Sequence, residues 1–339
     1  MANAHPSSSV AAGQSSGFPP MRLLAIGLLA ALVISPQLGL GNYTLHLMVM
    51  ALLWSTIYTS WSIMGRLGMV SFGHGAFLGI GAYAVVLLWN FYGISPWLGL
   101  LAGIAISVVV AVVIGYPCFR FKIVGHYFAL VTLALSEVTR LVIVGLRDMT
   151  GGSLGITPKP GLVDGATYSL SALQFSSKAV WFYIVLVFWL AALYVWHRVD
   201  RSMARLALEA ISAEEDAAAS VGIDVKRTKL SVMLLSAVMT CIGGALYAQY
   251  QLYVNPETVS GIGVSLQMVF GVIAGGMFVM LGPTVGAVFL LLLSEGLRVL
   301  IGNDVHGVDT TIYGLLLILF IIFMPKGILG AALERVGRR

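Results

Sequence analysis

Long apolar blocks, separated by short polar or glycine-rich breaks, recur along almost the whole sequence. About ten of them approach the roughly 20 residues that an α-helix needs to cross a hydrocarbon layer of about 30 Å, and they lack the strict alternation of barrel strands. Hydrophobic residues make up 59% of the 339 residues and charged residues 10%, a balance that no water-surrounded globule tolerates on its surface. The sequence therefore predicts an all-α, polytopic transmembrane helix bundle, with spans at 22–40, 43–64, 74–92, 96–116, 125–146, 181–197, 229–253, 264–281, 284–301 and 310–324.

The blocks divide the chain into a tail, a membrane domain and a second tail. Residues 1–20 are rich in Ser, Ala, Gly and Pro and are expected to form a disordered cytoplasmic tail, with the transmembrane domain at 21–330 and a cytoplasmic tail at 331–339. The block after Arg22 is too long for a removed signal peptide and lacks a small-residue cleavage site, so we count it as a span. Two long polar stretches, 147–180 and 198–228, must face opposite sides because a single span separates them.

Lysine and arginine set the orientation, because loops on the cytoplasmic side carry the excess of positive charge. With the amino end inside, most of the 19 lysines and arginines fall on the inner side. The outer side and the outer halves of spans keep Arg140, Arg147, Lys159, Lys178 and Arg298. The stretch 147–180 is then an outer loop, 198–228 is a cytoplasmic loop, and both termini are cytoplasmic. The basic residues that give the net charge of +5 lie along the predicted inner membrane face, so this charge does not indicate nucleic-acid binding.

The cytoplasmic loop is rich in alanine, glutamate and arginine, a mixture that favours a helix outside the membrane. We expect one helix over 201–221, ended by Gly222 as a left-handed cap residue. Its small-residue face consists of Leu206, Ala210, Ala213 and Ala217 at helical spacing. An amphipathic helix resting on lipid is one interpretation. Alanines in place of Leu, Phe or Trp favour close approach to another protein instead.

The segment GRLGMVSFGHGAFLGIGAY at 65–83 places glycines and a histidine between two apolar runs. Backbone that is not helical at membrane depth requires cover by protein or a water-filled cavity, so we expect a bend or a discontinuous helix facing the bundle interior. Ser71 and His74 offer hydrogen bonds there, and Gly75, Gly79 and Gly81 form a small-residue face for a neighbouring helix. The alternative is that the glycines serve packing alone and His74 is a buried, hydrogen-bonded histidine.

Charged residues recur inside two predicted spans. Glu137 and Arg140 lie three apart on one helical face, as do Glu295 and Arg298, and the fragments LSEVTRLVIVG and LSEGLRVLIGN hint at an internal repeat. Ionisable residues within a membrane indicate a functional site by default. Structural ion pairs whose arginines reach toward the outer face are the favoured alternative.

The outer loop begins RDMTGGSLGITPKPGLVDG, in which glycines and prolines mark tight turns. Such an ordered loop suits the reception of a solute-binding protein. An ordinary connector is the alternative that the sequence leaves open.

Several kinds of site find no support in the sequence. There is no Gly-Lys dipeptide and so no phosphate loop, and the six histidines show no metal-ligand spacing. We therefore expect no catalytic, metal or cofactor site in this chain. Cys118 and Cys241 lie in or beside apolar blocks and are interpreted as small buried residues without a disulfide.

Several motifs resemble those of one transporter family. Residues 216–222, DAAASVG, resemble the Glu-Ala-Ala, three residues, Gly loop by which permease subunits of bacterial ABC importers dock on their ATPase subunits, although Asp216 replaces the usual Glu and Glu215 comes one position early. The glycine-rich segment and the blocks GHYFALVTLALSEVTRLV, TGGSLGI, VIAGGMFVMLGPTVGAV and YGLLLILFIIFMPKGILG resemble, in the same order, permeases for branched-chain amino acids of the LivM-type subunit. The resemblance covers about 43–330.

The resemblance implies a transmembrane permease domain in a bacterial inner membrane, without enzymatic activity. It implies import of branched-chain or other hydrophobic amino acids, with ATP and Mg bound only by partner subunits. The implied partners are a second, LivH-type permease, two LivG/LivF-type ATPase subunits, a periplasmic or lipid-anchored solute-binding protein and membrane lipid, but no nucleic acid. For coupling to the ATPases it points to Glu209, Glu215, Asp216, Ala217, Ala218 and Gly222. The hypothetical translocation path comprises Ser71, Gly73, His74, Thr132, Glu137 and Arg140.

Two alternatives to this function stay open. Relatives within the resembled family carry urea, short amides or aromatic acids, and nothing in the sequence selects leucine over these. A different class, the ion-coupled secondary transporter, requires carboxylates inside the membrane and no docking helix. Only Glu137 and Glu295 qualify as such carboxylates, and the predicted docking helix argues for the importer.

Overall fold

The computed structural model describes residues 27, 30–161, 168–301, 314–315, 319 and 327–337. The chain separates into two units, 1–41 and 42–339. In the first, residues 30–34 are helical and lead into the 3-10 helix η1 (Ser35–Leu38), which ends at the left-handed Gly39. Most of the predicted spans 22–40 and 310–324 and the tail 1–20 lie outside the described residues.

The second unit contains seven segments that are long and apolar enough to cross a membrane. The polytopic helical architecture expected from the apolar blocks is therefore confirmed, and seven predicted spans, including the one at 284–301, coincide with helices to within a few residues. The segments are α2 (Asn42–Gly65), α3 (His74–Tyr92), α4 (Pro96–Arg120), α5 (Gly125–Gly145), α7 (Lys178–Asp200), α10 (Val225–Gln251) and, counted together, α11 (Pro256–Val259) with α12 (Ile262–Gly275). The helix α13 (Gly282–Ile301) is apolar over a shorter stretch, and α15 (Gly327–Gly337) packs against α12 and α13.

The span expected at 264–281 is displaced and broken, which corrects that prediction. It begins earlier, at Pro256, where the Asn255 side chain caps α11 by accepting from Thr258 N at 2.8 Å. The helix is interrupted between α11 and α12, and α12 stops at Gly275 because Gly276 has a φ of 112°. Only glycine adopts that backbone conformation without strain, so the helix cannot continue to 281.

The helix α2 lies at the centre of this unit, in contact with α7, α10, α12 and α13. Of its most apolar stretch, 83% is buried within the chain, against 28% for α4 and for α5. The latter two helices therefore present most of their apolar surface outward, as expected of helices that meet lipid or another membrane subunit.

Glycines permit the close crossing of α3 and α10. A Cβ atom added at Gly81 would collide with the backbone carbonyl of Cys241, and one added at Gly244 would collide with the carbonyl of Leu78. Gly81 thus serves as part of a small-residue face, as predicted. Cys241 and Cys118 are both buried, free thiols, as expected.

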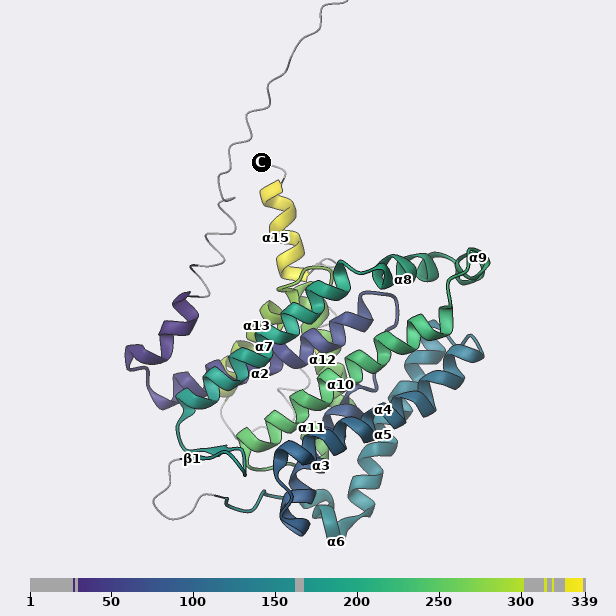
Figure 1. Cartoon of the computed structure of the whole chain (residues 1–339). Helices are drawn as coiled ribbons and strands as arrows, with labels where there is room; N and C mark the ends of the chain where they lie inside the picture. The colour runs from purple at the N-terminus through teal and green to yellow at the C-terminus, as the bar shows by residue number, and fades with distance from the viewer. Residues whose placement is uncertain are drawn as a thin grey trace, which may run out of the picture. The chain divides into compact units, whose positions relative to one another are not determined.

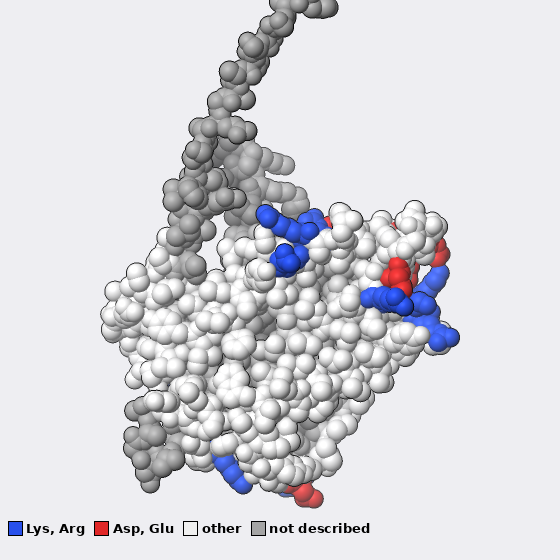
Figure 2. Space-filling view, in the orientation of Figure 1, with Lys and Arg blue, Asp and Glu red and all other residues white. Residues whose placement is uncertain are grey.

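The helices run alternately in opposite directions, so the bundle has two distinct ends (Figure 1). One end, here called the cationic face, carries α8 (Met203–Ala213), α9 (Glu215–Ser220) and most lysines and arginines of the visible surface (Figure 2). The opposite face carries the loop after α5, with α6 (Arg147–Thr150), η2 (Gly152–Leu154) and the antiparallel pair β1 (Tyr168–Ser169) and β2 (Gln174–Phe175). The two long polar stretches therefore lie on opposite ends, as predicted.

Candidate functional site

The loop 198–228 on the cationic face is called the coupling loop from here on. It contains two helices, α8 and α9, and the expected single helix over 201–221 is wrong. Glu214 between them is extended, with φ −158° and ψ 111°. The break places Glu215 and Asp216 in the first turn of α9, where the helix dipole stabilises negative charge. Gly222, with a φ of 91°, follows the end of α9, as predicted.

The coupling loop has one face on the bundle and one face outward. Leu208, Ile211 and Ala218 are buried in a cluster with bundle residues such as Trp196 and Phe119. The outward face includes the predicted small-residue face, all of it exposed, together with Met203 and Val221, which are 80% and 77% exposed. Apolar residues this exposed at both ends of a short loop are expected to meet a partner.

Two acids of α9 are paired with lysines of the bundle. Glu215 Oε2 accepts from Lys229 Nζ of α10 at 2.6 Å, and the two side chains are only 20% and 7% exposed. Asp216 accepts from Lys122, in the connection between α4 and α5, but that pair is open to solvent. The hydrogen bond and charge of Asp216 raise the pKa of Lys122. Glu215 and Asp216, two of the three acids named as coupling residues, therefore point back to the bundle.

A second ion-pair network ties α8 to the ends of α2 and α7. Asp200 Oδ1 accepts from Arg66 Nη1 at 2.7 Å and from Arg205 Nη1 at 3.1 Å, and Arg205 Nε donates to Glu209 Oε1 at 2.7 Å. The Arg66 guanidinium also lies over the ring of Trp196, 3.8 Å from its centroid. Glu209, the third predicted acid, thus belongs to this network.

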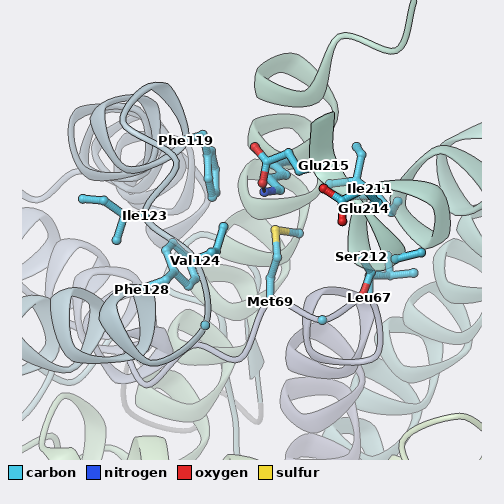
Figure 3. A pocket seen from close by; sticks show the side chains of 15 residues that line it. Leu67, Met69, Phe119, Ile123, Val124, Phe128, Ile211, Ser212, Glu214 and Glu215 are labelled. Atoms are coloured by element: carbon cyan, nitrogen blue, oxygen red, sulfur yellow. Dashed lines mark hydrogen bonds and ion pairs between the residues drawn. The ribbon is translucent and has the colours of Figure 1, made fainter. Parts of the chain in front are cut away.

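A cavity of about 320 Å³ lies between the coupling loop and the bundle. In Figure 3 the apolar side chains of Phe119, Ile123 and Phe128 face Glu215 and the end of α8 across it. The glycine-rich segment reaches the same cavity at Gly68 and Met69, and a Cβ at Gly68 would lie 2.8 Å from Ser212 Oγ of α8. Gly68, with a φ of 82°, therefore lets the segment touch the coupling loop directly.

The glycine-rich segment is discontinuous, as predicted. The helix α2 ends at Gly65 and α3 begins at His74, and side chains hydrogen-bond to part of the backbone between them. Phe72 N donates to Thr132 Oγ1 and Gly73 N to Ser71 Oγ, both at 3.1 Å, while Ser71 O accepts from Trp61 Nε1 at 2.7 Å. The structure thus brings three of the predicted path residues together: Ser71, Gly73 and Thr132.

His74 points away from these three residues, toward α10. Its Nε2 lies 2.7 Å from Ser236 Oγ, which itself donates to Ser60 O at 2.6 Å. The ring is buried between Trp61 and Phe77, and among the described residues its Nδ1 has no hydrogen-bond partner. The alternative of a buried, hydrogen-bonded histidine therefore matches its surroundings.

Serines form a further polar cluster where α11 and α12 break. Ser136 Oγ of α5 donates to Ser260 O at 2.8 Å and lies 3.1 Å from Ser265 Oγ, which accepts from Gly75 N at 3.0 Å. These serines were not predicted. Ser136 and Ser265 lie inside predicted spans, where a small polar residue among apolar neighbours is the signal that could have indicated them, whereas Ser260 precedes the predicted span.

The remaining predicted path residues, Glu137 and Arg140, lie apart from the serines. Arg140 pairs with Glu137 one turn earlier in α5, and its Nη1 donates to Glu257 Oε1 of α11 at 2.7 Å. This geometry agrees with a structural ion pair. Glu295 accepts from Tyr43 Oη at 2.9 Å, and the side chain of Arg298 lies outside the described residues.

The family model described as "Branched-chain amino acid transport system / permease component" matches residues 43–324. The chain belongs to this family. Membership confirms the resemblance drawn from the sequence motifs and fits a bundle in which apolar helices enclose buried polar clusters.

Within the described residues, no three His, Cys, Asp or Glu side chains are placed to hold a metal ion.

Curated relatives of this permease family extend the comparison. The chain is 30% identical over 286 residues to the high-affinity branched-chain amino acid transport system permease protein LivM of Salmonella typhimurium, covering 79% of this chain and 65% of that relative. It is 29% identical to LivM of Escherichia coli K12, with the same two coverages. The chain thus spans 65% of the length of these two relatives. The LivH permease protein of Salmonella typhimurium is 25% identical over 280 residues, covering 79% of this chain and 88% of LivH. No solved structure matches.

Proposed function

We propose that the chain is the transmembrane permease subunit of an ATP-driven ABC importer for branched-chain or other hydrophobic amino acids. The observation that carries the proposal is the coupling loop, with its exposed small-residue face outward and its acids paired to Lys229 and Lys122 of the bundle. The names of the LivM and LivH relatives support the substrate class. The proposal assigns ATP hydrolysis to separate ATPase subunits and no enzymatic activity to this chain.

The proposed orientation places the cationic face in the cytoplasm of a bacterial inner membrane, following the distribution of lysine and arginine. ATPase subunits then bind the outward face of the coupling loop. A solute-binding protein delivers solute at the opposite face, where the loop after α5 is held by the Ile156–Val254 backbone bridge. The outward apolar surface of α4 and α5 suits lipid and a second, LivH-type permease.

In the proposed mechanism, closure of the ATPase subunits displaces the coupling loop. The Glu215–Lys229 pair passes the displacement to α10, and the Ser212 contact with Gly68 passes it to the glycine-rich segment. The hydrogen bond from this segment to Thr132 carries the displacement on to α5. In the proposal α5 then moves relative to α3, and this movement switches the bundle between two access states. We propose that the path runs beside Ser71, Gly73 and Thr132.

Reconstitution tests this function. The chain, a second permease, the ATPases and a binding protein are assembled in liposomes, and uptake of leucine, urea and benzoate is measured. We expect leucine uptake that requires ATP. Uptake driven by an ion gradient without the ATPases would show a secondary transporter and overturn the proposal, and uptake of urea or benzoate alone would overturn the amino-acid assignment.

Docking itself is tested by placing a charge on the small-residue face. Ala210→Arg puts a long cation at an exposed position of α8 that does not line the cavity beside the bundle, where close approach of a partner requires small side chains. We expect loss of ATPase co-purification with the permease. The matched control, Ser153→Arg, changes an exposed residue on the opposite face and should leave co-purification unchanged. Equal retention of the ATPases by both variants would contradict the docking surface.

A further inference from the structure

A second cavity, of about 290 Å³, lies at the opposite face, far from the coupling loop. Its walls come from the start of α2, from β2, from the start of α7 and from the end of α10. The volume is at the small end of the roughly 300–1,000 Å³ typical of ligand sites, so it suits a solute of amino-acid size.

Aromatic side chains form an interlocked wall of this cavity. The rings of His46 and Tyr250 are stacked with centroids 5.5 Å apart, and His46 Nδ1 lies 2.7 Å from the Tyr250 hydroxyl. Trp181, which is 3% exposed, meets Tyr250 edge-on at 5.5 Å, and Phe175 meets Trp181 at 5.7 Å. Each ring fixes its neighbour, which gives a rigid apolar surface of the kind found in ligand sites.

The cavity is also lined by Gln249, whose amide is unsatisfied. The side chain is 1% exposed, and neither Nε2 nor Oε1 has a hydrogen-bond partner within the described part of the chain. By contrast, Gln174 in the same lining is fully engaged, because its Oε1 accepts from Gly161 N at 2.8 Å and its Nε2 donates to Lys159 O at 3.0 Å. Native proteins rarely leave a buried amide unpaired, so Gln249 offers an occupant the N–H donors of Nε2 and the acceptor oxygen Oε1.

Lys178 completes the lining with a positive charge. Its Nζ donates to the backbone carbonyl of Asn42 at 3.2 Å, and no described carboxylate lies within ion-pair distance. A carbonyl uses only one of the three ammonium donors, so Lys178 retains capacity for an anionic group.

We propose that this cavity binds the free α-amino acid solute at the opposite face, with Lys178 and Gln249 Nε2 holding the solute carboxylate, Gln249 Oε1 its ammonium group, and Trp181 and Tyr250 its apolar side chain. The inference rests on the proposed function and adds the first solute contact on the permease. Urea lacks the charged and apolar groups, and benzoate lacks the ammonium group, so only an apolar amino acid satisfies all three features.

Binding of radiolabelled leucine to the assembled importer in nanodiscs, without the binding protein, tests the site. Gln249→Leu and Lys178→Met should each weaken binding by about tenfold or more, because each removes a hydrogen bond to a charged group. Gln267→Leu and Arg120→Met are controls outside both this cavity and the coupling loop, and they should bind leucine as the unchanged chain does.

Two further readouts separate a binding role from a structural one. Gln249→Leu removes an unsatisfied buried amide, so its melting temperature should equal or exceed that of the unchanged chain. Unchanged leucine binding in Gln249→Leu would mean that the amide meets only water and would overturn the site. Competition by benzoate as strong as by leucine would overturn the amino-acid assignment. ATP-driven leucine uptake by the unchanged importer, measured separately in liposomes, shows that the proposed function holds even if the site fails.

Discussion

At the scale of single residues, Glu215 and Lys229 form a largely buried ion pair, with side chains that are 20% and 7% exposed. Removing one partner from such a pair leaves a desolvated charge, at a cost of about 3 kcal/mol when burial is nearly complete. We therefore expect Glu215→Gln to lower the melting temperature of the purified chain clearly. Asp216→Asn is the control, because its pair with Lys122 is open to water and contributes little. Equal melting temperatures for both variants would contradict the burial of the Glu215 pair.

Lys122 gives a prediction about pH. Asp216 raises the pKa of Lys122 above its usual 10.5, mainly through their hydrogen bond. A raised pKa in the folded state stabilises that state fully below pH 10.5, and the effect is lost as pH rises through the folded value. The side-chain nitrogen resonance of Lys122 should therefore titrate above 10.5, and Asp216→Asn should return it to the usual range. If Lys122 titrated identically in the unchanged chain and in Asp216→Asn, the Lys122–Asp216 pair would not exist in solution.

At the scale of elements, the α3–α10 crossing depends on backbone contact at Gly81. Because the obstacle to a side chain there is the Cys241 carbonyl, which cannot rotate away, Gly81→Ala must separate the helices. We expect a loss of about 1–3 kcal/mol, typical of overpacking, measured as a lower melting temperature. Gly263→Ala in α12 is the control, since nothing lies within 4 Å of its added Cβ, and the better helix former should leave stability equal or higher. An unchanged melting temperature in Gly81→Ala would contradict the close backbone contact between α3 and α10.

At the scale of the whole molecule, the question is whether the coupling loop conveys motion to the bundle. Replacing both members of the buried pair, Glu215→Met with Lys229→Met, leaves no unpaired charge and should keep the fold stable. We expect the number of leucine molecules imported per ATP hydrolysed to fall, because α10 loses its charged link to α9 while docking is kept. An unchanged ratio of leucine imported to ATP hydrolysed in the reconstituted importer would show that the motion of the coupling loop reaches the bundle by another contact, such as Gly68 with Ser212.

The positions of seven spans and the break at 66–73 followed from the sequence. A hydrocarbon layer requires helices of about 20 apolar residues, and glycine and proline mark where such helices stop. The exposed alanines of the coupling loop and the cap at Gly222 were likewise predictable, because helical spacing and glycine geometry are local. The same reasoning failed at Pro256, where the capping signal of Asn255 was not recognised, and at Glu214, whose extended backbone has no local signal.

Tertiary structure decided which polar groups meet. Lys122 and Asp216 are 94 positions apart in the chain and Arg66 and Asp200 are 134 apart, so no local pattern could pair them. The same holds for Ser136 with Ser260, for His74 with Ser236 and for the lining around Gln249. Apolar periodicity predicts that a helix is buried. It does not determine the rotation of the helix or which helices pack against it. Only the packed bundle, in which every buried polar group competes for a partner, fixes those contacts.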